Sequence, residues 1–394
     1  MQLLSSQVSG YLERASWIRK MFEEGARLKA EFGADKVYDF SLGNPDLPPP
    51  AAVGKGLADL AKAADKPFAL GYMPNAGYDD ARARLAEHLS REQGCALGAG
   101  DLILTCGAAG GLNAFFRAVL EPGEEVLAPA PFFVEYGFYT ENHGGVFKTV
   151  RAKELTFDLD LDAMAAAIGP KTRVVLVNSP NNPTGAVYSA EQMAGLVEML
   201  RRKTEEYGRP VFLAADEPYR FLAFDGAQVP TLLPMYEYAV VVSSFSKNLS
   251  LAGERLGFVA VAPQMPDKGR LMAGLVLTNR ILGFVNAPAV GQKLMAAALG
   301  SQVDVGVYAA RRKAMAEVLD AAGYEYSMPK GAFYFFPKAP GGDDIAFVNR
   351  LKEQRVLAVP GTGFGFPGYF RLTFCVDEKV IRAAADGFRK AAEI

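Results

Sequence analysis

The chain alternates short apolar runs, rich in β-branched residues, with longer stretches whose apolar residues recur at helical spacing. The short runs predict buried strands, and they lie at 101–106, 125–128, 146–150, 173–177, 210–215, 238–242 and 257–261. Helical patterns separate many of them, at 112–120, 189–207 and 268–299. Strands that alternate with helices in this way predict an α/β fold with a mostly parallel sheet.

The two ends of the chain have different patterns. Near the N-terminus, an amphipathic helix is expected over 9–32, where the apolar face would carry Trp17, Ile18, Met21, Phe22 and Leu28. After a border near residue 290, helices at 300–322 and 343–354 and strands at 333–336 and 369–374 predict a smaller α+β domain. We therefore expect an N-terminal arm (1–45), a large domain (46–290) and a small domain (291–394).

Composition narrows the function classes. A formal net charge of −2 over 394 residues gives no reason to expect nucleic acid or an anionic membrane as partner. Two histidines and three cysteines, without metal-site spacing, argue against a metal centre and against a Ser-His mechanism. The N-terminus has no basic, apolar leader, and no run approaches the ~20 apolar residues of a membrane span. A soluble protein of the reducing cytoplasm is expected.

One lysine stands where a buried strand ends. Lys247 follows the apolar run 238–242 and two serines, Ser244 and Ser246, and Arg255 comes eight residues later. A lysine in such a place is either solvated by a bend of the chain or used as an amine with a lowered pKa. Two hydroxyls and a guanidinium are suited to a phosphate. A surface turn with one solvated lysine is the alternative.

Polar residues also follow two other predicted strands. Asn182 lies in the turn-forming sequence Asn182-Pro183-Thr184-Gly185, which suits an ordinary turn as well as a site. Asp216 ends the run 210–215, and Tyr219 follows it. A carboxylate at the end of a buried strand needs a cationic partner, although a helix cap is an alternative for Asp216.

Two further features suit anionic ligands. The small residues Gly107, Ala108 and Ala109 stand where a strand turns into a helix, and free N–H groups at such a turn favour a phosphate. Arg371 lies inside the apolar strand 369–374. An unpaired guanidinium is costly there, so Arg371 needs a carboxylate, from a structural Asp or Glu or from a substrate.

Ser244-x-Ser246-Lys247 with Gly253-x-Arg255-x-Gly257 resembles the cofactor-lysine signature of the class I and II aminotransferases, which are pyridoxal phosphate enzymes of fold type I. The resemblance extends over nearly the whole chain and includes the N-P-T-G sequence at Asn182 and Asp216 with Tyr219. It implies a large domain with a mostly parallel, seven-stranded sheet flanked by helices, together with a smaller α+β domain. It also implies a homodimer with shared active sites.

The resemblance implies a role for each candidate residue. Lys247 would bind pyridoxal phosphate as a Schiff base and act as general base, Asp216 would keep the pyridine nitrogen protonated, and Asn182 and Tyr219 would hydrogen-bond the phenolic oxygen. Phe133 would stack on the ring, where the related acyltransferases tend to have histidine. The phosphate would be held by Gly107, Ala108, Ala109, Ser244, Ser246 and Arg255, and by Tyr72 of the partner subunit. Ala109 lacks the hydroxyl that many relatives have. Gly43 and Arg371 would bind the substrate carboxylate, and Asn182 would also belong to the substrate-binding residues.

The reaction implied is transamination by ping-pong kinetics. Aspartate, alanine and aromatic amino acids stay open as donors, and 2-oxoglutarate is the expected acceptor. Arg280 lies near the segment where dicarboxylate-specific relatives carry a second arginine, but a solvated helix residue is an equal alternative. A pyridoxal phosphate lyase acting at Cβ would share every motif. A regulator on the same fold would normally carry a DNA-binding module, and the chain begins almost directly with the aminotransferase arm.

Overall fold

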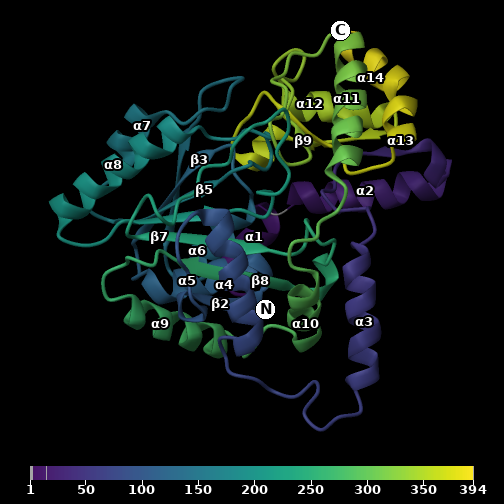
Figure 1. Ribbon diagram of the computed structural model, residues 1–394. Coiled ribbons are helices and arrows are strands. Elements are labelled where there is room, and N and C mark those ends of the chain that lie inside the picture. The colour runs from purple at the N-terminus through teal and green to yellow at the C-terminus, as the bar shows by residue number, and fades with distance from the viewer. Residues whose placement is uncertain (1–2, 15, 394) are drawn as a thin grey trace.

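The computed structural model describes residues 3–14 and 16–393, and it describes side chains for residues 3–12 and 24–393. A seven-stranded sheet crosses the larger part of the molecule (Figure 1). In spatial order its strands are β2 (Leu102–Cys106), β8 (Leu256–Val261), β7 (Ala239–Ser244), β6 (Phe212–Asp216), β5 (Thr172–Asn178), β3 (Glu125–Ala130) and β4 (Val146–Arg151). β8 runs antiparallel to both of its neighbours, and the other adjacent pairs are parallel. The predicted mostly parallel α/β sheet is confirmed.

Helices flank this sheet, which explains why its central strands are apolar along their whole length. β6, β7 and β8 are buried at every residue, as expected for strands covered on both faces. α5 packs against β7 and β8, and α8 packs against β6. The helices of this part are α3 (Ala51–Ala63), α4 (Asp79–Gln93), α5 (Gly107–Val119), α6 (Glu135–Glu141), α7 (Leu161–Ala167), α8 (Ala190–Tyr207), α9 (Lys268–Ile281) and α10 (Ala289–Ala298).

Two helical segments that flank the large sheet differ from their predicted boundaries. α5 begins at Gly107, although the small residues 107–111 suggested a turn before the helix. Gly111 serves packing within the helix, since a Cβ there would lie 3.0 Å from the side chains of Val242 and Val259. The helix expected over 268–299 is two helices, because α9 ends at Ile281 and Gly283 has a φ of 89°. Such a backbone conformation interrupts a helix.

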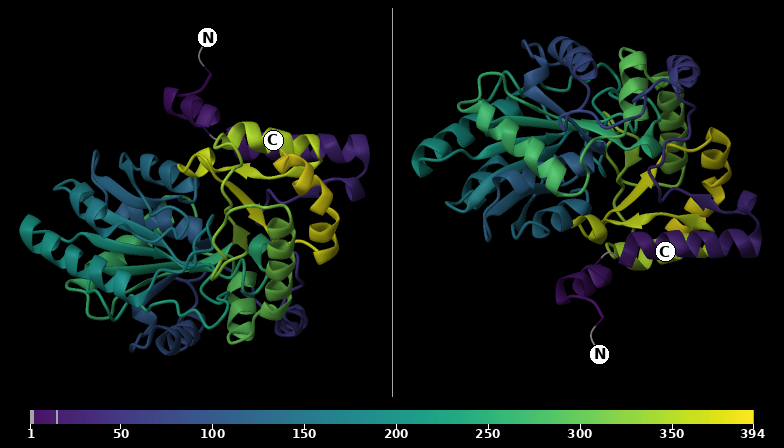
Figure 2. Two further views of the ribbon diagram at one scale, coloured as in Figure 1. Left: turned by 90° about the horizontal axis from the view of Figure 1, so that it is seen from above. Right: turned by 90° about the horizontal axis from the view of Figure 1, so that it is seen from below.

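The smaller part of the molecule lies beside the sheet (Figure 2). Its antiparallel three-stranded sheet has the order β11 (Val359–Pro360), β12 (Phe370–Thr373) and β9 (Tyr334–Phe335). Its helices are α11 (Val305–Ala321), α12 (Asp344–Glu353), α13 (Glu378–Ala383) and α14 (Ala385–Ala392). β1 (Tyr38–Asp39) pairs in parallel with β10 (Val356–Leu357), which fastens the N-terminal segment to this part. Short 3₁₀ turns span Ala34–Lys36, Ala99–Asp101, Ala252–Glu254 and Gly361–Phe364.

The helix predicted over 9–32 is divided into α1 (Ser6–Arg14) and α2 (Ser16–Phe32). α1 contacts α6, where the rings of Tyr11 and Phe138 lie 4.9 Å apart. α2 lies along the smaller part (Figure 2). Leu28 is buried with Val37 and Leu357, as expected for the apolar face. The other residues assigned to that face lie outside the described side chains; they are Trp17, Ile18, Met21 and Phe22.

Each part has its own large apolar core. One core is built around the seven-stranded sheet, and the other joins Phe40 and Tyr219 to α11, α12 and the small sheet. α10 packs against α3 and α4 in the first core. We propose the division into arm, large domain and small domain on this basis, and its border near residue 290 stays a prediction. Within the described residues, no helix has the length and apolar character needed to cross a membrane.

Candidate active site

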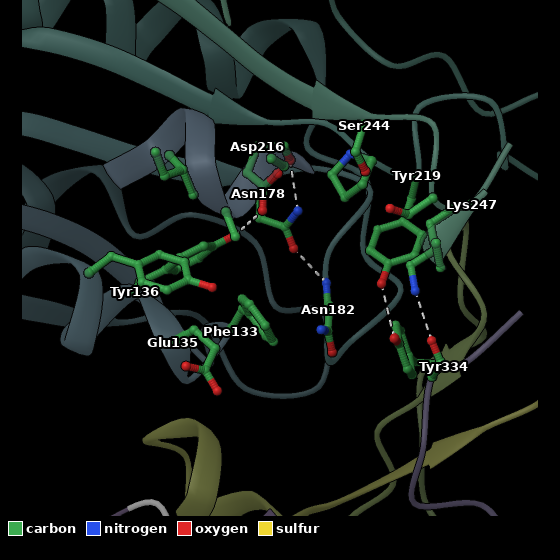
Figure 3. A pocket seen from close by; sticks show the side chains of 18 of the residues that line it. Phe133, Glu135, Tyr136, Asn178, Asn182, Asp216, Tyr219, Ser244, Lys247 and Tyr334 are labelled. Carbon is green, nitrogen blue, oxygen red and sulfur yellow. Dashed lines mark hydrogen bonds between the residues drawn. The ribbon is translucent and has the colours of Figure 1, made fainter. Parts of the chain in front are cut away.

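A cavity of about 370 Å³ opens where β5, β6 and β7 end and the smaller part begins. The carboxyl ends of parallel strands meet at one edge of a sheet, so residues distant in sequence converge there. Among the lining residues are twelve that the sequence singled out, namely Gly43, Ala108, Ala109, Phe133, Asn182, Asp216, Tyr219, Ser244, Ser246, Lys247, Arg255 and Arg371. Figure 3 shows how several of their side chains point toward one another.

Two other candidates lie outside this lining. Gly107 does not line the cavity but lies next to the guanidinium of Arg255, and its φ is 69°. A Cβ at Gly107 would lie 2.7 Å from Nη2 of Arg255, so glycine keeps room for the guanidinium. Tyr72 is 93% exposed and borders a separate hollow with Phe284 and Val285. Within one chain, Tyr72 is therefore not brought to the lysine.

Lys247 lies just beyond the end of β7, and its side chain is partly buried. Its Nζ donates a 2.8 Å hydrogen bond to the carbonyl oxygen of Gly43. Burial lowers the pKa of this amine to about 8, an effect that Arg371 and Arg255 increase and Cys375 opposes. An amine with such a pKa is partly neutral near pH 7 and can act as a nucleophile or a base. The solvated surface lysine considered from the sequence is thus ruled out.

Asp216 ends β6 with its carboxylate inside the cavity. Oδ2 accepts a 2.6 Å hydrogen bond from the hydroxyl of Tyr136 in α6. Oδ1 is buried and has no hydrogen-bond partner in the described part of the chain. Burial raises the pKa of this carboxyl to about 6, and the Tyr136 hydrogen bond opposes the rise. Within the described part of the chain, no backbone N–H donates to the carboxylate of Asp216. The helix-cap alternative is therefore not supported.

Asn178, the last residue of β5, joins the end of β6 to the loop that carries Asn182. Its Nδ2 donates to the backbone oxygen of Asp216 at 2.7 Å, and its Oδ1 accepts from the backbone N–H of Asn182 at 2.7 Å (Figure 3). Both distances are those of good hydrogen bonds. The ends of two neighbouring strands are therefore held in a fixed relation below the cavity.

Arg371 reaches the cavity from β12 and is 5% exposed. Nη1 donates to Oδ1 of Asn182 at 3.0 Å, and Nη2 donates to the backbone oxygen of Ser41 at 2.6 Å. The rings of Tyr334 and Phe364 each lie 4.8 Å from the guanidinium carbon. Nε is buried without a partner, and no carboxylate in the described residues bonds this arginine. The structural carboxylate considered as its partner is absent there, which leaves the guanidinium ready for an external one.

Two tyrosines close the side of the cavity near the lysine. The hydroxyls of Tyr219 and Tyr334 are 3.0 Å apart (Figure 3). A Cβ at Gly43 would overlap the hydroxyl of Tyr334. The loop from residue 41 to 44 therefore approaches the cavity closely only because position 43 has no side chain.

The sequence did not reveal Tyr136, Asn178, Tyr334 or Ser41. Asn178 directly follows a predicted strand, so its position was a usable signal. Tyr136 comes from a seven-residue helix without a motif, and Ser41 contributes only its backbone oxygen to Arg371. A backbone acceptor has no sequence signature.

Comparison with known families identifies the family to which the chain belongs. Residues 35–388 match the sequence profile described as Aminotransferase class I and II. The chain belongs to the class I and II aminotransferases. It is 30% identical to the aspartate aminotransferase of Pyrococcus horikoshii, with 97% of this chain and 96% of that protein covered. It is 32% identical to the aspartate/prephenate aminotransferase of Thermus thermophilus, covering 91% of each chain.

The fold agrees with this assignment. A crystal structure of an aminotransferase from Eubacterium rectale superposes with a TM-score of 0.95 at 38% identity, covering 99% of this chain and 98% of that one. The resemblance seen in the sequence is therefore confirmed for the family and for the fold. Class I and II aminotransferases of the aspartate aminotransferase type use pyridoxal phosphate, so this aminotransferase is a pyridoxal phosphate enzyme.

The residues of the cavity fit this cofactor. The unpaired Oδ1 of Asp216 is a suitable acceptor for a protonated pyridine nitrogen. The first turn of α5 brings Ala108 and Ala109 to the same cavity as Ser244, Ser246 and Arg255, and N–H groups, hydroxyls and a guanidinium together suit a phosphate. Lys247 supplies the amine, and the ring of Phe133 lines the space between these groups.

Proposed function

We propose that this aminotransferase transfers the amino group of an L-amino acid to a 2-oxo acid by ping-pong kinetics. Aspartate, alanine and aromatic amino acids are the donor candidates, and 2-oxoglutarate is the proposed acceptor. The observation that carries the proposal is the presence in one cavity of a partly buried Lys247 with a lowered pKa and a buried Arg371 that has no carboxylate partner among the described residues. Aspartate is named for both relatives in the comparison, which supports its place among the donors.

Each residue is assigned a proposed task. Arg371 binds the substrate α-carboxylate in a bidentate pair, and Asn182, which already accepts from Arg371, holds the guanidinium in place. Lys247 removes the proton from the substrate Cα and returns it at the neighbouring carbon of the cofactor. Because Arg371 fixes the α-carboxylate, cleavage of the Cα–H bond is favoured over decarboxylation. When bound, pyridoxal phosphate supplies the electron sink for the charge formed at Cα.

The cofactor-holding residues complete the assignment. Asp216 keeps the proton on the pyridine nitrogen, and Tyr136 keeps Asp216 ionised by donating to Oδ2. Asn182 and Tyr219 donate to the phenolic oxygen. Ser244, Ser246, Arg255 and the first turn of α5 bind the phosphate.

The visible spectrum of the holoenzyme tests this function. Aspartate, alanine, phenylalanine and glutamate are added separately, and conversion of the bound cofactor to its pyridoxamine form by any of them shows the first half-reaction. A 2-oxo acid must then restore the original spectrum. Release of ammonia together with pyruvate, without the pyridoxamine form, would instead identify the lyase alternative.

We also propose a homodimer with shared active sites. Tyr72 is 93% exposed, and the neighbouring Phe68 and Leu70 are 91% and 53% exposed. An apolar, outward segment of this kind is typical of a surface that a partner covers. In the proposed dimer, Tyr72 of one subunit donates to the phosphate in the other. A cytoplasmic location stays a proposal, consistent with cysteines that are free at positions 95, 106 and 375.

A further inference from the structure

Five charged side chains line the cavity, and the proposed function uses four of them. Lys247, Arg255 and Arg371 are basic, and Asp216 and Glu135 are acidic. The three basic groups are assigned to the amine, the phosphate and the α-carboxylate, and Asp216 is assigned to the pyridine nitrogen. Glu135 is left without a task.

Glu135 is the first residue of α6, two positions after Phe133 and next to Tyr136. Its side chain is half-buried, and its carboxylate forms no hydrogen bond or ion pair with the described residues. In Figure 3 this carboxylate lies on the side of the cavity away from Asp216. Burial raises the pKa of Glu135 above its usual value. An acidic group that lines a ligand cavity and has no cationic partner there interacts directly with the charge of a bound ligand.

A substrate with a second carboxylate lacks an obvious partner in this chain. The proposed function assigns a ligand group to each basic residue of the cavity. Arg280, the other candidate, is exposed and borders a different cavity with Arg82 and Met272. A distal carboxylate would therefore meet Glu135 as a like charge, whereas an amide N–H or an ammonium would find an acceptor.

We propose that Glu135 determines side-chain preference in this aminotransferase. It selects against donors and acceptors that carry a second carboxylate, and it favours substrates whose side chain ends in an N–H donor, either a neutral amide or a cationic amine. The proposal rests on the proposed function, because it takes Arg371 as the holder of the α-carboxylate. It makes aspartate and 2-oxoglutarate tolerated substrates rather than preferred ones.

Aspartate and asparagine give the sharpest test, because they have nearly the same shape and differ in distal charge. The measured quantity is kcat/KM for aspartate divided by kcat/KM for asparagine, in the holoenzyme. Glu135→Gln keeps the size of the side chain and removes its charge. It should raise this ratio about tenfold, since a like charge in a partly solvated cavity is removed. Glu135→Ala should change the ratio in the same direction.

The matched control is Glu205→Gln, which removes one negative charge from the exposed side of α8. It should leave the ratio unchanged, because the change in net charge is the same and the cavity is not touched. A ratio that stays constant or falls in Glu135→Gln contradicts the proposal. A fall would show that Glu135 holds a cation, such as a partner subunit's arginine, which in turn binds the distal carboxylate.

Binding of maleate separates this proposal from the proposed function. Maleate has two carboxylates and no amino group, so its dissociation constant, read from the cofactor spectrum, does not depend on turnover. Glu135→Gln should bind maleate about tenfold more tightly than the wild type. Tighter binding without any amino-group transfer would keep the role of Glu135 and reject the aminotransferase reaction. Unchanged binding in an active transaminase would reject the role of Glu135 alone.

Discussion

The hydroxyl of Tyr136 donates a 2.6 Å hydrogen bond to Oδ2 of Asp216, and Oδ1 of the same carboxylate has no partner in the described part of the chain. The carboxylate is thus stabilised on one oxygen and free on the other. Burial raises the pKa of this carboxyl to about 6, and the hydrogen bond from Tyr136 opposes that rise. The tyrosine stabilises the ionised form of Asp216, and the unpaired oxygen stays available to accept a hydrogen bond from a ligand.

Replacement of Tyr136 should therefore weaken the hold on the cofactor. In Tyr136→Phe the pKa of Asp216 rises further, because the hydrogen bond that lowers it is lost. We expect the dissociation constant of pyridoxal phosphate to increase about tenfold, the size of one charged hydrogen bond. The acid limb of the pH dependence of kcat/KM should also move to higher pH.

A tyrosine elsewhere provides the control for Tyr136→Phe. The hydroxyl of Tyr326 donates a 2.7 Å hydrogen bond to Oδ1 of Asp320 on the outside of the molecule. Tyr326→Phe removes a comparable Tyr–Asp contact and should leave cofactor binding as it is. Equal effects of the two variants would mean that Tyr136 only supports the fold.

Lys247 should lower the free energy of unfolding of the cofactor-free protein at neutral pH. Its pKa is about 8 in the folded chain and near 10.5 when exposed, so between these values the unfolded chain binds more protons. The free energy of unfolding must then rise with pH from about 8 to about 10.5. The cost is fully present below pH 8, about 3 kcal/mol for a shift of this size, and it disappears above pH 10.5.

Lys247→Met tests this cost. The variant keeps the length of the side chain and removes its charge, so the cofactor-free variant should be more stable than the wild type at pH 7 and equally stable near pH 10.5. Urea unfolding at the two pH values measures the difference. Lys62→Met, at a lysine whose side chain is 76% exposed, should show no such pH dependence. The Lys247 variant should also lose transamination while it still binds the cofactor; an active variant would overturn the assignment of Lys247.

Adding one methyl group at Gly107, beside the proposed phosphate-binding residues, should weaken cofactor binding. In Gly107→Ala, the new Cβ would meet Nη2 of Arg255 at 2.7 Å, and the residue would keep a φ of 69°. Gly123→Ala has the same backbone problem, at a φ of 82°, with nothing within 4 Å of its Cβ. Both variants should lose about 1 kcal/mol of stability. Only Gly107→Ala should also weaken cofactor binding, by about tenfold or more, because only it displaces Arg255, which we propose binds the phosphate.

Gly107 and Gly111 show how much of this region could be predicted from the sequence. Gly107 was found because a run of small residues follows a predicted strand. The strand was predicted from its apolar run, which is typical of a strand covered on both faces of the sheet. The turn expected over 107–111 was nevertheless the first part of α5. A glycine that permits a turn and a glycine that lets a helix approach a sheet look alike in sequence, and only the packing of Gly111 against Val242 and Val259 separates them.

The site shows the same limit. Lys247, Asp216 and Arg371 were found from charge in apolar surroundings, which is a property of the sequence. Tyr136 and Ser41 were missed because each acts through a contact with a residue far along the chain, 80 positions away for Tyr136 and 330 for Ser41. Such pairs exist only once the topology brings the strand ends and loops together.

Tyr72 provides a test of the proposed dimer. Its hydroxyl cannot serve the cavity of its own chain, because the side chain is 93% exposed beside a different hollow. Tyr72→Phe should therefore leave the fold unchanged, since it removes no contact within the subunit, and should weaken cofactor binding about tenfold through the loss of a phosphate hydrogen bond. The cofactor spectrum titrated against pyridoxal phosphate measures this loss, and sedimentation shows the oligomeric state. Dilution of the wild type until the dimer dissociates should lower cofactor affinity to a similar degree. A monomer with full affinity, or a dimer indifferent to Tyr72→Phe, would show that each subunit holds its phosphate alone.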